Sequence, residues 1–391
     1  MMSLWDALRM NMMISYQELV RTFLRGIAAL LVVMFHIRGT LNGVYAQSNL
    51  GDLLFQSGSA GVDLFFVISG FIICLSSKKD EDNNVSKFAI RRAFRIYPLF
   101  FVSLIAYQLF VYHEFNIYSF VRSAFLLPRD YNGSAPFFGY NILYPAWTLL
   151  FEVSFYALFA ISMAVSHRHR IKVCSVLIIC IYFYSTISQS GGINFSGIVH
   201  VLHSERSLTT VLAYTLGSPM MLLFVCGMWV YSFYDSLIKN EIHINRNLCL
   251  YIFFVCSSLY TVLFLSGYKS GIGLSGYGFW AIILITGCLA YEITGPAISK
   301  SLLFLGDISY SLYLTHVITI GIFDNNASFF SIYPESIGIP RFMLLLTSSI
   351  AIAIPVYFFV EKPSIALGKK LVSRLYGKNR DTIYNSQTTR Q

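Results

Sequence analysis

The sequence predicts an all-α polytopic membrane protein, built as a single bundle of about ten transmembrane helices. Hydrophobic residues make up 56% of its 391 residues and charged residues only 12%, whereas a soluble domain carries roughly 25% charge. The mean hydropathy is +0.62, and apolar runs of about 20 residues, enough to cross a bilayer as a helix, recur along the chain. This composition excludes soluble, disordered and disulfide-stapled classes of protein.

Ten apolar stretches are predicted to span the membrane, with polar loops between them. The ninth is the least regular, because Asp307, Ser309 and His316 interrupt it. The stretch before the first span lacks the short apolar core and small-residue cleavage site of a signal peptide, so we expect the first span to be retained. In order, the predicted spans are 22–41, 57–77, 97–113, 145–165, 171–188, 208–232, 248–266, 273–291, 302–323 and 341–361.

The positions of the basic residues predict which side of the membrane each loop occupies. Of the 28 Lys and Arg, 22 fall in the termini and alternate loops of one side, and six fall in the loops of the other. Because Lys and Arg concentrate in cytoplasmic loops, both termini and the loop 78–96 are expected in the cytoplasm. The loops 114–144 and 324–340 are expected outside. The net charge of +9 therefore reflects membrane topology, and we expect no nucleic-acid partner.

The predicted domains are a cytoplasmic N-terminal segment (1–21), a transmembrane domain (22–363) and a basic cytoplasmic tail (364–391). The seven cysteines lie in or beside apolar runs without a CxxC pair, which is typical of buried thiols. One His-x-His pair and one His-x-x-His pair occur in predicted loops, but no Cys or carboxylate accompanies either pair at the spacing of a metal site. We therefore expect no metal.

Ionisable residues inside the spans are the best indication of a site, because they are costly in a bilayer and usually face a cavity or a partner. Arg25 and His36 are 11 positions apart in the first span. On a helix this separation is three turns plus about 20° and ~16 Å, so both lie on one face, with Arg25 nearer the cytoplasm. A snorkelling arginine and an unrelated histidine paired inside the bundle would give the same spacing.

Three further spans add polar groups. Asp63 in the second needs a partner, and Glu152 and Tyr156 in the fourth share a face at i,i+4. In the ninth, Ser309, Tyr313 and His316 form a stripe at i, i+4 and i+7. Such stripes predict one shared polar cavity, and they fit either an enzyme or a transporter.

A basic pair, Arg92 and Arg95, precedes the third predicted span. Positive-inside bias alone would place basic residues there. Guanidinium groups are also well shaped to bind phosphate through two hydrogen bonds, so this pair is a second candidate site.

Six segments, in order along the chain, resemble the membrane acyltransferase-3 family, which includes O-antigen and exopolysaccharide O-acetyltransferases. They span roughly 25–363, nearly the whole chain. The segments are Arg25-x10-His36, GVDLFFVISGF (61–71), RAFRIYP (92–98), WTLLFEVSFY (147–156), LGDISYSLYLTH (305–316) and EKP (361–363).

The resemblance implies ten core helices and transfer of an acyl group from cytoplasmic acyl-CoA, most simply acetyl-CoA. The implied acceptor is a hydroxyl of a carbohydrate or lipid-linked glycan on the outer side, such as O-antigen or exopolysaccharide. The implied location is the bacterial inner membrane, where the protein contacts membrane lipid. The chain resembles stand-alone members that lack an appended hydrolase-like domain.

A sugar hydroxyl is a poor nucleophile at neutral pH, so a histidine base suits this chemistry. His36 is therefore the expected base, or a transient acyl acceptor. Arg25 is expected to hold the donor phosphates or pantetheine, or to stabilise the oxyanion. Asp63 or Glu152 is expected to orient His36.

Arg92 and Arg95 are expected to bind the CoA phosphates. A transporter or flippase for a polar solute is the alternative function, and a purely structural protein explains an intramembrane His36 poorly. The expected residues of the substrate cavity are Tyr156, Ser309, Tyr310, Tyr313 and His316.

Overall fold

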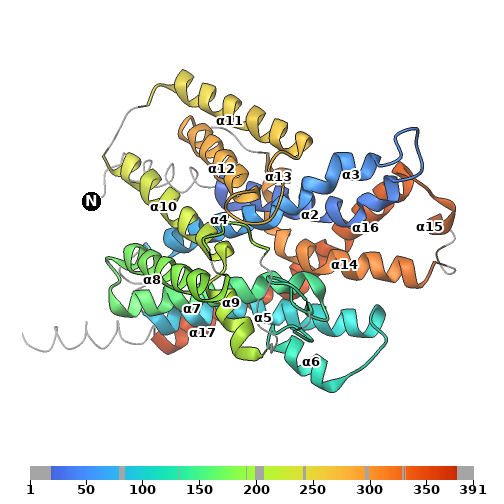
Figure 1. Cartoon of the computed structure of the whole chain (residues 1–391), viewed down its shortest axis with the longest axis horizontal. Coiled ribbons are helices and arrows are strands. Elements are labelled where there is room, and N and C mark those ends of the chain that lie inside the picture. The colour runs from blue at the N-terminus through green and yellow to red at the C-terminus, as the bar shows by residue number, and fades with distance from the viewer. Residues whose placement is uncertain are drawn as a thin grey trace, which may run out of the picture.

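The computed structural model describes residues 19–78, 84–131, 133–190, 192–198, 207–240, 244–295, 299–327, 330 and 332–376. Within these ranges the regular structure is helical, apart from isolated bridge residues such as the pair Ser196 and Gly273, which confirms the predicted all-α class (Figure 1). The helices are η1 (Leu19–Phe23), α2 (Leu24–Ile37), η2 (Arg38–Leu41), α3 (Leu50–Phe55), η3 (Gln56–Ser59), α4 (Ala60–Ser76), α5 (Val85–Phe110), α6 (Ile117–Ala124), η5 (Tyr144–Ala146), α7 (Trp147–Val165), α8 (Arg170–Ser185), η6 (Thr186–Ser190), α9 (Leu208–Leu216), α10 (Pro219–Lys239), α11 (Arg246–Ser266), α12 (Tyr277–Ile293), α13 (Lys300–Asp307), α14 (Ser309–Asn325), α15 (Ile332–Glu335), α16 (Ile339–Val356), η7 (Tyr357–Glu361) and α17 (Lys362–Tyr376).

The predicted spans correspond to these helices. In the described part of the chain, 8 helical stretches are long and apolar enough to cross a membrane. The shorter apolar helix α12 coincides with the predicted span 273–291, and α13 and α14 together coincide with 302–323. α13 and α14 meet at an angle of 65°. The break falls at Ile308, between Asp307 and Ser309.

Two helices extend beyond the predicted spans. α5 begins at Val85 rather than 97, because the Asn84 side chain accepts hydrogen bonds from the backbone N–H groups of Ser86 and Lys87 and caps the helix. Arg92 and Arg95 therefore lie inside α5, about two to three turns from its start. At the other end of the chain, α16, η7 and α17 follow one another without a loop to Tyr376, so the predicted start of the tail at 364 falls within α17.

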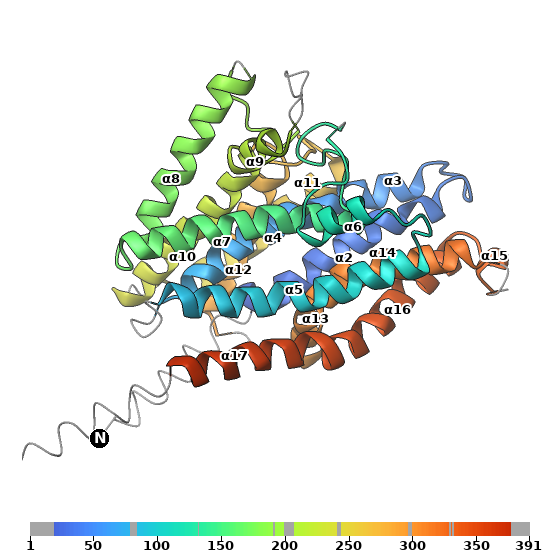
Figure 2. The same ribbon diagram turned by 90° about the horizontal axis from the view of Figure 1, so that it is seen from below.

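Helix α4 lies inside the bundle and packs against α2, α10 and α12; Figures 1 and 2 show it beside α10. Two glycines bring α4 and α10 into close contact. A Cβ atom on Gly70 would lie 2.2 Å from the Phe224 carbonyl oxygen, and one on Gly227 would lie 2.0 Å from that of Val67. Small residues permit this approach of helices in membranes. The close packing holds α4 in place as one wall of the site.

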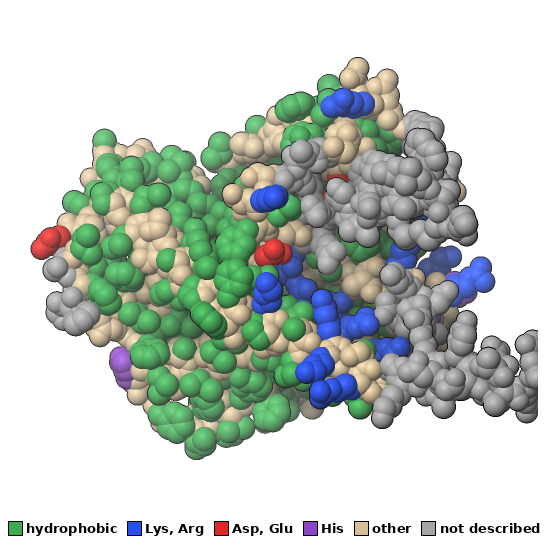
Figure 3. All heavy atoms as spheres, turned by 180° about the vertical axis from the view of Figure 1, so that it is seen from behind, with side chains coloured by type: hydrophobic (Ala, Val, Ile, Leu, Met, Phe, Trp, Pro, Cys, Tyr) green, Lys and Arg blue, Asp and Glu red, His purple; other side chains and the backbone are tan. Residues whose placement is uncertain are grey.

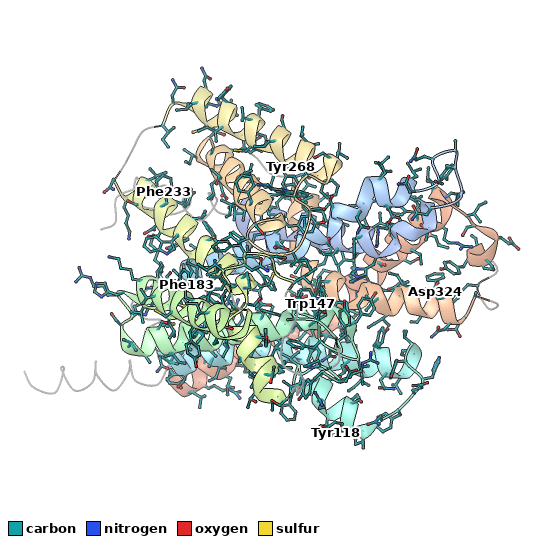
Figure 4. The ribbon with its side chains drawn as sticks, in the orientation of Figure 1. Tyr118, Trp147, Phe183, Phe233, Tyr268 and Asp324 are labelled. Atoms are coloured by element: carbon teal, nitrogen blue, oxygen red, sulfur yellow. The ribbon has the colours of Figure 1, made fainter. Side chains whose placement is uncertain are left out.

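Exposed apolar side chains cover the outside of the bundle, as expected where a helix faces lipid. Phe183 on α8 and Phe233 on α10 are examples, and Figure 4 shows their positions near the periphery, whereas Trp147 lies close to the centre of the view. Figure 3 shows a face that is largely hydrophobic, with Lys and Arg gathered over one part of it. This separation of apolar and basic surface agrees with an integral membrane protein.

Candidate functional site

A pocket with about 580 Å³ of empty space, including its opening, lies within the bundle. Its wall comes from α2, α4, α5, α7 and α14, so segments far apart in the sequence meet there. Its polar lining residues are Arg25, Ser69, Arg95, Thr148, Glu152, Tyr310 and Tyr313, and its apolar ones are Val62, Phe65, Phe66, Ile96 and Leu149. The structure thus brings five of the sequence-predicted site residues together around one space.

A smaller pocket, with about 260 Å³ of empty space including its opening, adjoins the first, since Arg25 and Arg95 line both. Arg92 and Tyr156 line this second cavity. The Arg92 guanidinium donates a hydrogen bond of 2.6 Å to the Ser76 hydroxyl and lies 5.5 Å from the Tyr156 ring. Three guanidinium groups, from two helices, therefore border adjoining cavities.

Two buried or half-buried carboxylates balance these arginines. Glu152 accepts hydrogen bonds from the hydroxyls of Tyr156 and Ser69. Glu361 accepts a hydrogen bond of 2.6 Å from the Ser311 hydroxyl. Arg25 lies within electrostatic range of Arg95, which repels it, and of Glu361 and Glu152, which attract it. Such mutual compensation makes a charged cavity tolerable inside a membrane protein.

Sequence reasoning assigned no role to Glu361. The sequence nevertheless offers a reason to consider Glu361 as a candidate site residue, because it is a carboxylate at the end of the last predicted span, within the EKP segment. In the structure Glu361 is 4% exposed and closes the π-helical turn η7 between α16 and α17. π-Helical turns occur frequently at functional sites.

The two membrane-embedded histidines contact each other. His36 Nδ1 lies 2.9 Å from the Val32 carbonyl oxygen and 3.1 Å from His316 Nε2, and His316 Nδ1 lies 3.2 Å from the Leu312 carbonyl oxygen. One assignment of protons is consistent with all three contacts: His316 Nδ1–H donates to the Leu312 carbonyl, and the single His36 Nδ1–H is shared between the Val32 carbonyl and His316 Nε2. His36 Nε2 is then left with its lone pair, as a general base requires.

The histidine pair does not line the cavity, and Tyr313 connects the two parts of the site. The Tyr313 ring borders the cavity and its centroid lies 6.1 Å from that of His316. The Tyr313 hydroxyl lies 2.9 Å from the Thr148 hydroxyl and donates to the Pro145 carbonyl oxygen, also at 2.9 Å. The site is thus an arginine-lined cavity and a histidine pair, with Tyr313 at the boundary.

Asp63 and Glu152 do not orient His36 in this structure, which corrects the sequence-based expectation. Asp63 is fully buried, and its Oδ1 accepts a 2.7 Å hydrogen bond from the Gly273 N–H in the loop before α12. Glu152 faces the cavity. The role of orienting His36 falls instead to the Val32 carbonyl and to His316, which was expected only as a cavity residue.

Ser309 lies apart from the cavities, although it was predicted to line them. Its side chain is fully buried at the start of α14, and its hydroxyl has no hydrogen-bond partner among the described residues. The polar stripe at i, i+4 and i+7 therefore divides between a buried serine, a cavity tyrosine and a histidine of the pair.

The structure is a helical membrane bundle that holds a polar cavity and a histidine pair, and the sequence comparisons identify the class of protein to which it belongs. The chain belongs to the acyltransferase-3 family: the family profile described as an acyltransferase domain matches residues 22–358. The family named from the sequence motifs is thereby confirmed.

The chain is also similar to two named proteins. The chain is 29% identical over 330 residues to "Exopolysaccharide production protein ExoZ" of Rhizobium meliloti (strain 1021), covering 81% of this chain and 92% of that protein. It is 24% identical over 306 residues to "Putative acetyltransferase ORF330" of Acidianus two-tailed virus, covering 75% of this chain and 81% of the viral protein. No solved structure shows a significant match.

Proposed function

We propose that this protein transfers an acyl group, most simply acetyl, from cytoplasmic acyl-CoA to a hydroxyl of a cell-surface polysaccharide or lipid-linked glycan. The observation that carries the proposal is the convergence of Arg25, Arg92 and Arg95 on adjoining cavities beside a histidine pair. Arginines suit the phosphates of the donor, and a histidine suits the activation of a hydroxyl. The names of the two relatives, which refer to exopolysaccharide production and to an acetyltransferase, agree with this acceptor and this group.

The histidine pair supports a direct transfer. His36 Nε2 takes the proton of the acceptor hydroxyl while the hydroxyl oxygen attacks the carbonyl carbon of the thioester. The tetrahedral intermediate then collapses, the C–S bond breaks, and His36 returns the proton to the leaving thiolate. The products are an O-acyl ester and CoA thiol. The Val32 carbonyl and His316 keep the proton on Nδ1, so that Nε2 is the basic nitrogen.

The helix geometry favours one of the roles considered for Arg25. Arg25 lies eleven positions before His36 on one continuous helix, α2, a rise of ~16 Å. A guanidinium at that distance does not reach an oxyanion formed beside His36. We therefore assign Arg25 to the phosphates or pantetheine of the donor, whose extended arm would carry the thioester towards the histidine pair.

An acetyl-CoA turnover assay separates this enzyme from the alternative, a transporter or flippase for a polar solute. Purified protein in lipid nanodiscs would receive acetyl-CoA and polysaccharide isolated from cells that lack the protein. The enzyme releases CoA thiol only when the polysaccharide is present, and mass spectrometry finds an O-acetyl increment on the glycan. Thiol release without acetylated glycan, or no release, contradicts the proposed function.

Changing Arg92 and Arg95 together to lysine is expected to raise the apparent KM for acetyl-CoA severalfold or more. Both side chains border the cavities from one face of α5 at i,i+3. Lysine keeps the positive charge that sets topology but loses the planar fork that binds phosphate through two hydrogen bonds. The measurement is the donor KM and the acceptor KM of the double variant. Unchanged donor kinetics with normal insertion would assign these arginines to topology alone.

The proposed orientation, with both termini in the cytoplasm, predicts a labelling pattern. A cysteine placed at Ser86, near the start of α5, should resist a membrane-impermeant thiol reagent in intact cells, and one placed at Glu114, before α6, should react. Both positions are exposed on the protein, and the background must lack the native cysteines. Permeabilised cells, in which both should react, are the control, and the reverse pattern in intact cells would overturn the topology.

A further inference from the structure

Three tyrosines form a cluster near His36, and none of them lines the two cavities of the site. The Tyr144 ring centroid lies 5.4 Å from that of His36, and the Tyr107 ring meets the Tyr144 ring edge-on at 6.4 Å. Tyr140 lies within electrostatic range of Tyr144. Tyr107 is in the last turn of α5, and the other two lie between α6 and α7. In the proposed orientation this end of the bundle faces outside, whereas Arg25 lies nearer the cytoplasm.

The hydroxyl groups of this tyrosine cluster are not used by the protein itself. Among the described residues, none of the three hydroxyls takes part in a hydrogen bond. Tyr140 is 37% exposed, and Tyr107 and Tyr144 are half-buried. His36 is also half-buried, and the hydrogen bonds of its ring within the described part of the chain involve Nδ1. Because a tyrosine hydroxyl inside a protein usually has a hydrogen-bond partner, these hydroxyls and His36 Nε2 indicate a site for a polar ligand.

Buried hydrogen bonds hold the segment that carries Tyr144. Asn141 is 2% exposed, and its side-chain amide donates a 2.9 Å hydrogen bond to the Ser123 carbonyl oxygen of α6. The carbonyl oxygen of Pro145, the next residue after Tyr144, accepts a 2.9 Å hydrogen bond from the Tyr313 hydroxyl. The Tyr144 ring is therefore fixed beside His36 before any ligand arrives, which lowers the entropy cost of binding.

The loop between α6 and α7 also carries backbone strain. Leu126, Phe138 and Tyr140 have φ angles of 63°, 49° and 53°, in the left-handed region that residues other than glycine rarely adopt. Such conformations persist only where the surrounding structure enforces them, and they cluster at active sites and at sites that clamp a ligand. The Tyr140 ring stacks on that of Phe137, with the centroids 5.2 Å apart, and remains partly exposed. One strained residue thus presents an aromatic ring at the surface of the tyrosine cluster.

We propose that Tyr107, Tyr140 and Tyr144 form the acceptor subsite, which binds a sugar ring of the glycan so that one of its hydroxyls meets His36 Nε2. The assignment rests on the proposed function and extends it by naming where the acceptor binds. A sugar ring has apolar C–H faces and a rim of hydroxyls, and a tyrosine offers both an apolar ring and a hydroxyl. The acceptor then approaches His36 from the end of α2 opposite to Arg25, so the donor and the acceptor enter by separate paths.

Removing the three hydroxyls while keeping the rings tests this assignment. The assay uses purified protein in lipid nanodiscs, acetyl-CoA, and polysaccharide isolated from cells that lack the protein. The variant Tyr107→Phe with Tyr140→Phe and Tyr144→Phe is expected to raise the KM for the polysaccharide about tenfold or more, since up to three hydrogen bonds are lost, and to leave the KM for acetyl-CoA unchanged. The control, Tyr268→Phe, removes the hydroxyl of an exposed tyrosine that lies away from Trp147 in Figure 4, and it should change neither KM.

A protection experiment gives a second readout that does not depend on the triple variant. A cysteine in place of Tyr140, in a background that lacks the native cysteines, should react with a thiol reagent severalfold more slowly when the polysaccharide is present. Acetyl-CoA alone should not slow the reaction, and a cysteine in place of Tyr268 should react at the same rate throughout.

Tyrosines are also enriched where membrane helices meet the lipid headgroups, and that role predicts a different result. If the cluster only contacts lipid, the triple variant keeps the wild-type KM for the polysaccharide and the polysaccharide does not protect position 140. Either result overturns the acceptor subsite alone, because turnover by the wild-type protein still supports the proposed function. A raised KM for acetyl-CoA with an unchanged KM for the polysaccharide also overturns it. No turnover by the wild-type protein overturns the proposed function, and this assignment falls with it.

Discussion

Replacing His36 with alanine is expected to lower O-acyl transfer about 10²–10⁴-fold, the usual cost of removing a general base. The variant should still insert and bind acyl-CoA, because the arginines proposed to hold the donor border the cavities and the histidine pair does not. The measurements are glycan-dependent release of CoA thiol and binding of a non-hydrolysable acetyl-CoA analogue. Loss of rate with retained binding is the expected pair of results.

His36→Gln is the matched control for packing at this position. The glutamine side chain fills similar space beside Tyr144, whose ring centroid lies 5.4 Å from that of His36, but it cannot accept a proton. It should therefore be as inactive as the alanine variant. Near-normal transfer by either folded variant would remove His36 from the mechanism. A rapid quench with radiolabelled acetyl-CoA tests for an acyl-histidine, and label retained on the wild-type protein would replace direct transfer with a two-step route.

The sequence was sufficient to predict the fold because each span is a local property of the chain. Hydropathy over about 20 residues identifies a membrane helix, and the ten predicted stretches coincide with helices of the structure. Helix ends were less predictable. The Asn84 cap extends α5, and the angle between α13 and α14 arises from backbone geometry that hydropathy does not register.

The site could be predicted only in part, because its contacts are not local. The sequence indicated Arg25, His36 and Glu152 as ionisable groups within spans. It could not show that His316, 280 positions away from His36, is its partner. It also could not show that the Asp63 carboxylate accepts a hydrogen bond from the backbone N–H of Gly273, because neither sequence segment contains information about its contacts with the other.

Substitution of His316 is expected to have the second large effect on the rate of acyl transfer, because His316 contacts His36 from another helix. It is fully buried, and its Nε2 lies 3.1 Å from His36 Nδ1. We expect His316→Leu to lower kcat by about 10²-fold, the cost of a misplaced catalytic group. The KM for acetyl-CoA should not change. Leucine fits a buried site and leaves the His36 Nδ1–H its bond to the Val32 carbonyl, so the protein should fold.

A conservative variant separates positioning from packing at this residue. In His316→Gln the amide oxygen can take the place of the imidazole Nε2 and accept the same hydrogen bond from His36 Nδ1–H. This variant should therefore recover most of the rate that His316→Leu loses, with both proteins equally stable to heating in nanodiscs. If glutamine and leucine lower kcat alike, the hydrogen bond to His36 does not contribute to catalysis. If His316→Leu instead raises the donor KM at unchanged kcat, His316 acts on acyl-CoA binding, and the tautomer of His36 is set by the Val32 carbonyl alone.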